Sequence, residues 1–231
     1  MKYPLSISLV IPMFNNKSTA LQQLRMCEEV LKNTVSKPFE IIVCDDSSSD
    51  GSLSLVRAAF KQHKCFHIIT HKTNQGIART IQELYKKARY DYIILFSIDG
   101  DWDPNDIKKL IMHTYRAHAD ITIGKRNKRS YSLYRKSLSF LYNFLSFILF
   151  RVQTFDAGSI KVIKKSVFRS ISLQSTSVFF EAELIIKAHK QGYRISSYPI
   201  SFKRDNKKAS GGKLKLVIQS AWDLLKLRFS L

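Results

Sequence analysis

The sequence predicts an α/β fold with a mostly parallel sheet flanked by helices. In the first half of the chain, short apolar runs rich in Val and Ile alternate with segments of helical spacing. Polar loops follow several of the apolar runs, and 231 residues are enough to bury one substantial core. Because the carboxyl ends of parallel strands meet at one edge of a sheet, we expect the polar loops to form a ligand site there.

Each expected element rests on its residue pattern, with a period of two for strands and of three to four for helices. Proline ends the first apolar run, which supports a strand that stops there. The predicted strands are Ser6–Pro12, Glu40–Cys44, Phe66–Thr70, a run that ends at Asp99, Asp120–Gly124 and Ile195–Phe202. The predicted helices are Thr19–Lys32, Leu53–His63, Ile77–Ala88, Asn105–Ala117, residues 178–191 and the amphipathic Leu214–Leu231. We expect one domain over residues 1–215 and a C-terminal amphipathic tail over residues 216–231.

The charge of the chain favours a polyanionic partner. The sequence has 38 Lys and Arg residues against 18 Asp and Glu residues, a formal net charge of +20. Nucleic acid, anionic lipid and phosphate-bearing substrates would all suit this charge. Nucleic acid is the weakest of these hypotheses, because the aromatic residues gather in an apolar block and do not alternate with lysines as stacking platforms do.

The cysteines and the first residues indicate a reducing compartment. Cys27, Cys44 and Cys65 are odd in number and lack the spacing of a metal site, so we predict buried thiols. Met1 to Pro4 lead directly into a strand, without the apolar region and cleavage site of a signal peptide. The expected location is the cytoplasm or the cytoplasmic face of a membrane.

Leu138–Val152 is the most unusual segment, since it is apolar except for a narrow polar stripe at helical spacing. It is shorter than the roughly 20 apolar residues that cross a bilayer. A buried core helix would explain it. An interfacial helix would also explain it, because the flanking Arg135, Lys136 and Arg151 could reach lipid headgroups.

Three carboxylates lie at the C-terminal end of the apolar run that follows Asp91. Asp99, Asp101 and Asp103 occupy alternate positions, and they would repel one another unless a hard cation such as Mg²⁺ or Mn²⁺ lay between them. Such a cation keeps open positions for phosphate oxygens, so this turn is a candidate metal and nucleotide-sugar site. An acidic helix N-cap at Asp103–Asp106 is the simpler alternative.

Four motifs in this order resemble family 2 glycosyltransferases of the GT-A fold, which has a Rossmann-like sheet. They are Ile11–Asn16, Asp45–Gly51, Asn74–Gly76 and Asp99–Asp101. The resemblance continues toward dolichol-phosphate mannose synthase and bacterial polyprenyl-phosphate glycosyltransferases through Gly124–Arg126, Asp156–Ser159, the Phe180–Ala188 segment and Gly192–Arg204. It covers roughly residues 6–215. It implies transfer of a sugar from a nucleotide-diphosphate donor to a polyprenyl phosphate, dolichyl or undecaprenyl. The apolar segment Leu138–Val152 and the cationic residues on either side of it lead us to expect a peripheral protein at the cytoplasmic membrane face.

The resemblance also implies roles for individual residues in donor binding. The base and ribose would be held by Pro12, Phe14, Asn16, Cys44 through its backbone, and Asp46. The diphosphate and its metal would be held by Asp99, Gly100 and Asp101, with Asp103 as a third metal contact. The Asp46 carboxylate could accept N–H donors of uracil or guanine, or it could cap a turn. Phe14-Asn15-Asn16 stands where the family usually has Tyr-Asn-Glu, which leaves the donor open.

A phosphate acceptor needs cations and no strong base, because its nucleophilic oxygen is already ionised. The resemblance assigns this role to Arg126 and Arg204, with Arg135 and Lys213 as further candidates. The catalytic set is thus Asp101, Arg126 and Arg204. In an alternative reading the acceptor is a saccharide of a surface polymer or lipopolysaccharide. Its hydroxyl would need a general base, for which Glu181, Glu183 and Asp156 are the candidates.

Overall fold

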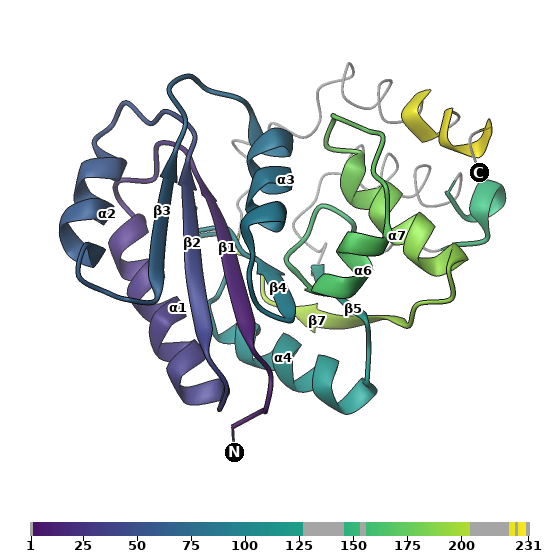
Figure 1. The fold of residues 1–231 in the computed structure, drawn as a ribbon, viewed down its shortest axis with the longest axis horizontal. Coiled ribbons are helices and arrows are strands. Elements are labelled where there is room, and N and C mark those ends of the chain that lie inside the picture. Colours follow the sequence, from purple (N-terminus) through teal and green to yellow (C-terminus); the bar gives the residue numbers. More distant parts are fainter. Residues whose placement is uncertain (1, 127–145, 153–155, 204–221, 225, 230–231) are drawn as a thin grey trace.

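The computed structural model describes residues 2–126, 146–152, 156–203, 222–224 and 226–229. Its centre is a seven-stranded sheet with the order β3-β2-β1-β4-β6-β5-β7 (Figure 1). The strands are β1 (Ile7–Met13), β2 (Phe39–Asp45), β3 (Phe66–Thr70), β4 (Tyr92–Leu95), β5 (Ile121–Arg126), β6 (Lys161–Lys164) and β7 (Ile195–Ile200). The pairs β1–β2, β1–β4, β2–β3 and β5–β7 are parallel, whereas β6 runs antiparallel to both β4 and β5. The predicted mostly parallel sheet is therefore confirmed.

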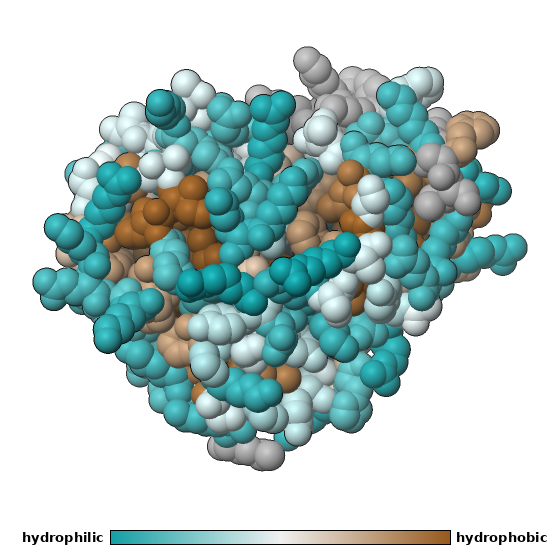
Figure 2. Space-filling view, viewed as in Figure 1, coloured by the Kyte–Doolittle hydropathy of each residue, from teal (hydrophilic) through white to brown (hydrophobic). Residues whose placement is uncertain are grey.

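Helices cover both faces of the sheet. They are α1 (Ala20–Thr34), α2 (Ser52–Phe60), α3 (Ile77–Lys87), α4 (Asn105–Ala117), α6 (Lys165–Ser170) and α7 (Phe180–Lys190). Alternate residues of each central strand face opposite sides. Leu9 of β1 therefore belongs to the core cluster that includes residues of α1, α2 and α4, whereas Val10 belongs to the cluster that includes residues of α3 and α7. The side that Figure 2 shows is mainly hydrophilic, with smaller apolar areas between polar side chains.

The main differences from the predicted elements are a shorter strand before the acidic residues and two additional elements. The strand expected to end at Asp99 stops at Leu95. Asp99 therefore lies four residues beyond the strand, on the loop that also carries Asp101 and Asp103. Strand β6 and helix α6 were not predicted. Leu214–Leu231 is helical where it is described, at residues 222–224 and 226–229, and Leu224 and Leu227 pack into the same core cluster as α7.

Only part of the apolar segment Leu138–Val152 lies among the described residues. Residues 146–150 are helical. Phe150 and Val152 are buried in the core, while Phe147 and Ile148 are 45% and 55% exposed. The end of this segment thus combines both interpretations, a core contact and an exposed apolar surface. Within the described residues, no helix has the length and apolar character needed to span a bilayer.

The cysteine prediction agrees with the structure in most respects. All three thiols are free, with Cys27 and Cys44 buried and Cys65 partly buried. Burial raises the pKa of Cys27 and raises that of Cys44 to about 12. Both therefore behave as inert core residues.

Candidate active site

A cavity of about 280 Å³ opens at the carboxyl edge of the sheet, where the predicted polar loops meet. The ends of β1 and β2, the loop between β3 and α3, and the loop after β4 surround it. Its lining consists of Pro12, Met13, Phe14, Asn16, Asp46, Asn74, Gly76, Ile77, Thr80, Ser97 and Asp99. Five predicted binding residues therefore share one cavity: Pro12, Phe14, Asn16, Asp46 and Asp99. Cys44 is fully buried and is not one of the residues that line this cavity.

The loop after β1 places an exposed aromatic ring at this cavity. Phe14 is 49% exposed, and its backbone N–H donates to Asn16 Oδ1 at 3.1 Å. Asn15 has a positive φ of 53° and is anchored by Ser48 Oγ, which accepts its N–H at 2.9 Å. The loop is thus held in one shape, with the Phe14 ring available for stacking on a ligand.

Asp46 sits at the inner wall of the cavity and is 4% exposed. Its Oδ1 accepts hydrogen bonds from His71 Nδ1 and the Gln75 backbone N–H, each at 2.7 Å, and its Oδ2 accepts from the Gly76 N–H at 2.9 Å. Burial works against its charge, but these hydrogen bonds outweigh burial and lower the pKa of Asp46. The carboxylate therefore stays ionised and fixes the turn that starts α3.

His71 was not predicted as a site residue. Its Nε2 lies 3.0 Å from Glu83 Oε2, and its ring is clamped between that carboxylate and Asp46. Burial opposes a charge on the ring, but the hydrogen bonds to Asp46 and Glu83 raise the pKa of His71. The one available signal was its position directly after a predicted strand, in the loop that carries Asn74–Gly76.

The acidic loop does not gather its three carboxylates into one cluster. The Asp101 N–H donates to Asp99 Oδ1 at 3.1 Å, across Gly100, whose φ of 86° favours glycine. Asp103 Oδ1 instead accepts from the backbone N–H and the side-chain amide of Asn105, at 2.9 and 3.0 Å, at the start of α4. No group of three potential metal ligands occurs in the described part of the chain. Asp103 thus fits the helix-cap alternative, and Asp99 with Asp101 forms the acidic pair.

Arg126 ends β5 beside a buried carboxylate. Its Nε donates to Asp156 Oδ2 at 2.6 Å, and a second guanidinium nitrogen pairs with Asp156 Oδ1. The guanidinium also lies over the rings of Trp102 and Phe202, at 5.6 and 5.2 Å from their centroids. Trp102 directly follows Asp101 within the acidic loop, so this contact ties Arg126 to the segment that carries Asp99 and Asp101.

The candidate bases of the saccharide alternative are buried and paired. Glu181 contacts the fully buried Lys161 and accepts from Tyr85 Oη at 3.0 Å. Glu183 lies 2.6 Å from Lys187 Nζ and accepts the backbone N–H groups of Gln174 and Ser175 at 2.9 and 2.8 Å. Both carboxylates thus already accept hydrogen bonds from buried neighbours.

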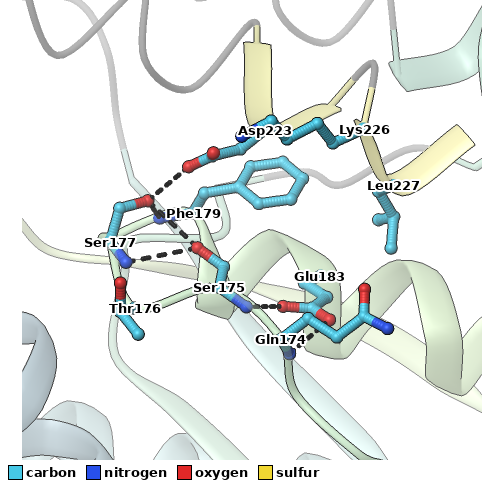
Figure 3. Close-up of a pocket in the computed structure, with 9 residues that line it drawn as sticks. All are labelled: Gln174, Ser175, Thr176, Ser177, Phe179, Glu183, Asp223, Lys226 and Leu227. Atoms are coloured by element: carbon cyan, nitrogen blue, oxygen red, sulfur yellow. Dashed lines mark hydrogen bonds between the residues drawn. The ribbon is translucent and has the colours of Figure 1, made fainter. Parts of the chain in front are cut away.

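Glu183 also borders a second cavity, of about 240 Å³, between the 174–179 loop and the C-terminal helix (Figure 3). Ser177 Oγ donates to Asp223 Oδ2 at 2.7 Å across this cavity. The contact fastens the C-terminal helix to the loop before α7. Three further predicted phosphate contacts, Arg135, Arg204 and Lys213, lie outside the described residues.

Comparison with known proteins identifies the family. Residues 8–172 match the family described as "Glycosyl transferase family 2". The chain belongs to this family. It is a glycosyltransferase, and the resemblance predicted from the motifs is confirmed.

Two groups of curated relatives are similar to this glycosyltransferase. An undecaprenyl-phosphate 4-deoxy-4-formamido-L-arabinose transferase of Pseudomonas paraeruginosa is 28% identical over 143 residues, which cover 61% of this chain and 42% of the relative. The match thus spans about two fifths of the length of that bacterial enzyme. The dolichyl-phosphate beta-glucosyltransferase of Saccharomyces cerevisiae is 24% identical and covers 97% of this chain and 74% of the relative.

Solved structures share the fold. Glucosyl-3-phosphoglycerate synthase from Mycobacterium tuberculosis, in complex with Mn²⁺, UDP-glucose and phosphoglyceric acid, has a TM-score of 0.75 and 13% identity and covers 97% of this chain and 80% of that one. A mannosyltransferase from Pyrobaculum calidifontis with GDP-mannose and Mn²⁺ has a TM-score of 0.58 and 18% identity, over 85% of this chain and 55% of that one. The glycosyltransferase thus has the predicted GT-A fold.

Proposed function

We propose that this glycosyltransferase transfers a sugar from a nucleotide-diphosphate donor to a polyprenyl phosphate at the cytoplasmic face of a membrane. The observation that carries the proposal is the similarity, over 97% of the chain, to an enzyme named for a dolichyl-phosphate acceptor. The bacterial relatives are named for an undecaprenyl-phosphate acceptor, which is the same chemical class.

The cavity at the carboxyl edge would bind the donor. The exposed ring of Phe14 would stack on the base while Asp46 accepts an N–H from it. Asp99 lines the same cavity, so the diphosphate would extend toward the acidic loop. In this arrangement Pro12 and Asn16 shape the wall between the base and the ribose.

The acidic pair fits a divalent cation. Mg²⁺ is usually bound by one or two carboxylates together with substrate phosphates and water, and Asp99 and Asp101 supply two oxygen ligands on one short turn. A bound Mg²⁺ or Mn²⁺ would supply positive charge that stabilises the leaving diphosphate. Gly100 lies between these two residues, and its left-handed backbone conformation lets the chain turn between Asp99 and Asp101.

A phosphate acceptor agrees with the chemistry of the carboxylates. Transfer to a saccharide hydroxyl needs a general base, but Glu181, Glu183 and Asp156 are each held by a cation. A phosphate oxygen needs no base and instead needs cations that offset repulsion between two anions. Arg126 is the described candidate, and its guanidinium is held in place by Asp156 and two aromatic rings.

Attachment to a membrane would use charge and exposed apolar side chains. Phe147 and Ile148 are exposed, and Trp222 and Phe229 are 59% and 91% exposed. In the sequence, the basic stretch Lys125–Lys136 precedes Phe147 and Ile148. Anionic headgroups would attract a protein of charge +20, with about 1 kcal/mol for each cation near the surface. These features suit a peripheral protein.

Incubation with labelled nucleotide sugars tests the proposal. The purified protein receives Mg²⁺ or Mn²⁺ and either undecaprenyl phosphate, dolichyl phosphate or a saccharide acceptor. We expect label in the organic phase with a polyprenyl phosphate. Label transferred only to the saccharide would overturn the proposed acceptor.

Co-sedimentation with anionic vesicles tests the membrane part. A double change of Phe147→Ser and Ile148→Ser should release protein to the supernatant. Val178→Ser is the matched control, because Val178 is also 44% exposed but lies on the loop before α7. Equal binding of all three proteins would show that residues 147–148 do not hold the membrane.

A further inference from the structure

Asp46 has little capacity left for a ligand. An ionised carboxylate offers about four lone-pair sites, two on each oxygen. Oδ1 already accepts two hydrogen bonds, from His71 Nδ1 and the Gln75 N–H, and Oδ2 accepts one, from the Gly76 N–H. One acceptor site therefore remains on this carboxylate, and it lies on Oδ2.

His71 keeps Oδ1 occupied because the ring is held at both ends. Its side chain is 11% exposed, and Nε2 faces Glu83 Oε2 at 3.0 Å, with Cys44 Sγ at 3.5 Å. Each ring nitrogen faces a carboxylate. When the ring is a cation, both nitrogens carry a hydrogen and each can donate to the carboxylate that it faces. Turning the ring away from Asp46 would break the contact with Glu83 as well.

The bases of nucleotide donors differ in what they present to such a carboxylate. Guanine offers two adjacent N–H donors on one edge, and they pair with both oxygens of a carboxylate. Uracil offers a single imide N–H. Adenine and cytosine place a ring-nitrogen lone pair beside their amino group, which a carboxylate oxygen would repel.

We infer that His71 is a specificity-determining residue, which restricts the donor base to one that offers a single N–H to Asp46, as uracil does. The inference rests on the proposed donor site and deepens it. A guanine base would have to displace His71 or the Gln75 N–H from Oδ1 to form its paired contact. Displacing His71 would leave Nδ1 of a side chain that is only 11% exposed without its partner, and displacing the Gln75 N–H would break the hydrogen bond that holds the turn before α3; both changes are unfavourable.

Calorimetric binding of four nucleotides tests the inference without any acceptor or sugar transfer. UDP, GDP, CDP and ADP are titrated into the full chain with Mg²⁺ or Mn²⁺ present. We expect UDP to bind at least about tenfold more tightly than GDP, since a lost or conflicting polar contact commonly changes affinity by this factor or more. Equal or tighter binding of GDP would overturn the inference and leave the donor site in place. Failure of all four to bind would overturn the proposed donor site itself.

Two variants separate the role of His71 from a general effect on the loop. His71→Ala frees one acceptor site on Oδ1, so the preference for UDP over GDP should fall by about tenfold. Glu83→Gln is the matched control, because its amide oxygen can still accept from Nε2 while Nδ1 stays on Asp46, and the preference should persist. An unchanged preference in a folded His71→Ala protein would refute the role of His71. If that variant does not fold, the comparison of nucleotides on the native protein decides the question.

Discussion

The buried pair of Lys161 and Glu181 gives the sharpest test of the packing behind the active site. Lys161 is fully buried on β6, and Glu181 is 4% exposed on α7. Glu181 contacts Lys161 through Oε2, and its Oε1 accepts a hydrogen bond from Tyr85 Oη at 3.0 Å. We change Lys161 to Met, Glu181 to Leu, and both together, because these side chains have similar volumes and no charge.

Each single change should destabilise the protein by about 3–5 kcal/mol, since it leaves one buried charge without its partner. That is a large part of the roughly 5–15 kcal/mol that holds a domain folded. The double change removes both charges and should cost much less than the sum of the single changes. Its remaining cost is the unpaired Tyr85 hydroxyl, about 1–3 kcal/mol.

Urea unfolding followed by circular dichroism measures these free energies. Lys32→Met is the control, because Lys32 pairs with Glu28 at 2.6 Å but its side chain is 58% exposed, so the loss should be below about 1 kcal/mol. A Lys161→Met protein as stable as the Lys32→Met protein would refute the reasoning. The reasoning would also be refuted by a double variant whose loss of unfolding free energy equals the sum of the two single losses.

Three further predictions concern other parts of the structure. Gly124→Ala should lower the free energy of unfolding by about 1–3 kcal/mol, because a Cβ there would lie 2.6 Å from Ile200 Cδ1. Gly158→Ala is the control and should change thermal unfolding little, because open space surrounds Gly158. His71→Gln should lose most stability relative to the native protein at or below about pH 6.5. The raised pKa of His71 stabilises the fold there, and the difference should shrink as the pH rises through that raised pKa; a constant difference from pH 5 to 9 would contradict this. Asp101→Asn should reduce transfer about a hundredfold or more, and full activity in excess chelator would refute the metal requirement.

The sequence predicted the parallel half of the sheet closely. Phe66–Thr70 and Asn105–Ala117 have the observed bounds, because a short β-branched run and a helix that begins after a proline carry strong local signals. The strand before the acidic residues was predicted to extend to Asp99, but β4 ends at Leu95. Phe96 and Ile98 are as buried as strand residues, so their apolar character could not distinguish the end of β4 from the buried loop after it.

Strand β6 could not be predicted from its own residues. Lys161–Lys164 is a four-residue segment with a lysine at each end, and only the tertiary pairing with Glu181 explains why Lys161 is buried there. The role of His71 could not be predicted from its local sequence either. Its site role depends on Asp46 and Glu83, which are distant in sequence, so a single histidine after a strand carried too little information.

The position of β6 between β4 and β5 also sets an order of assembly during synthesis. Strands β1 to β4 can pair with one another once residue 95 has left the ribosome. Among the described strands, β5 pairs with β6 and β7, so it has no neighbour in the sheet until residues 161–164 follow. Over that interval β4 presents an open edge, which is a site for aberrant pairing between nascent chains. Closure by the last third of the chain completes both the sheet and the contacts around Arg126 and Asp156, so the proposed donor site in the first half would form before the proposed acceptor site.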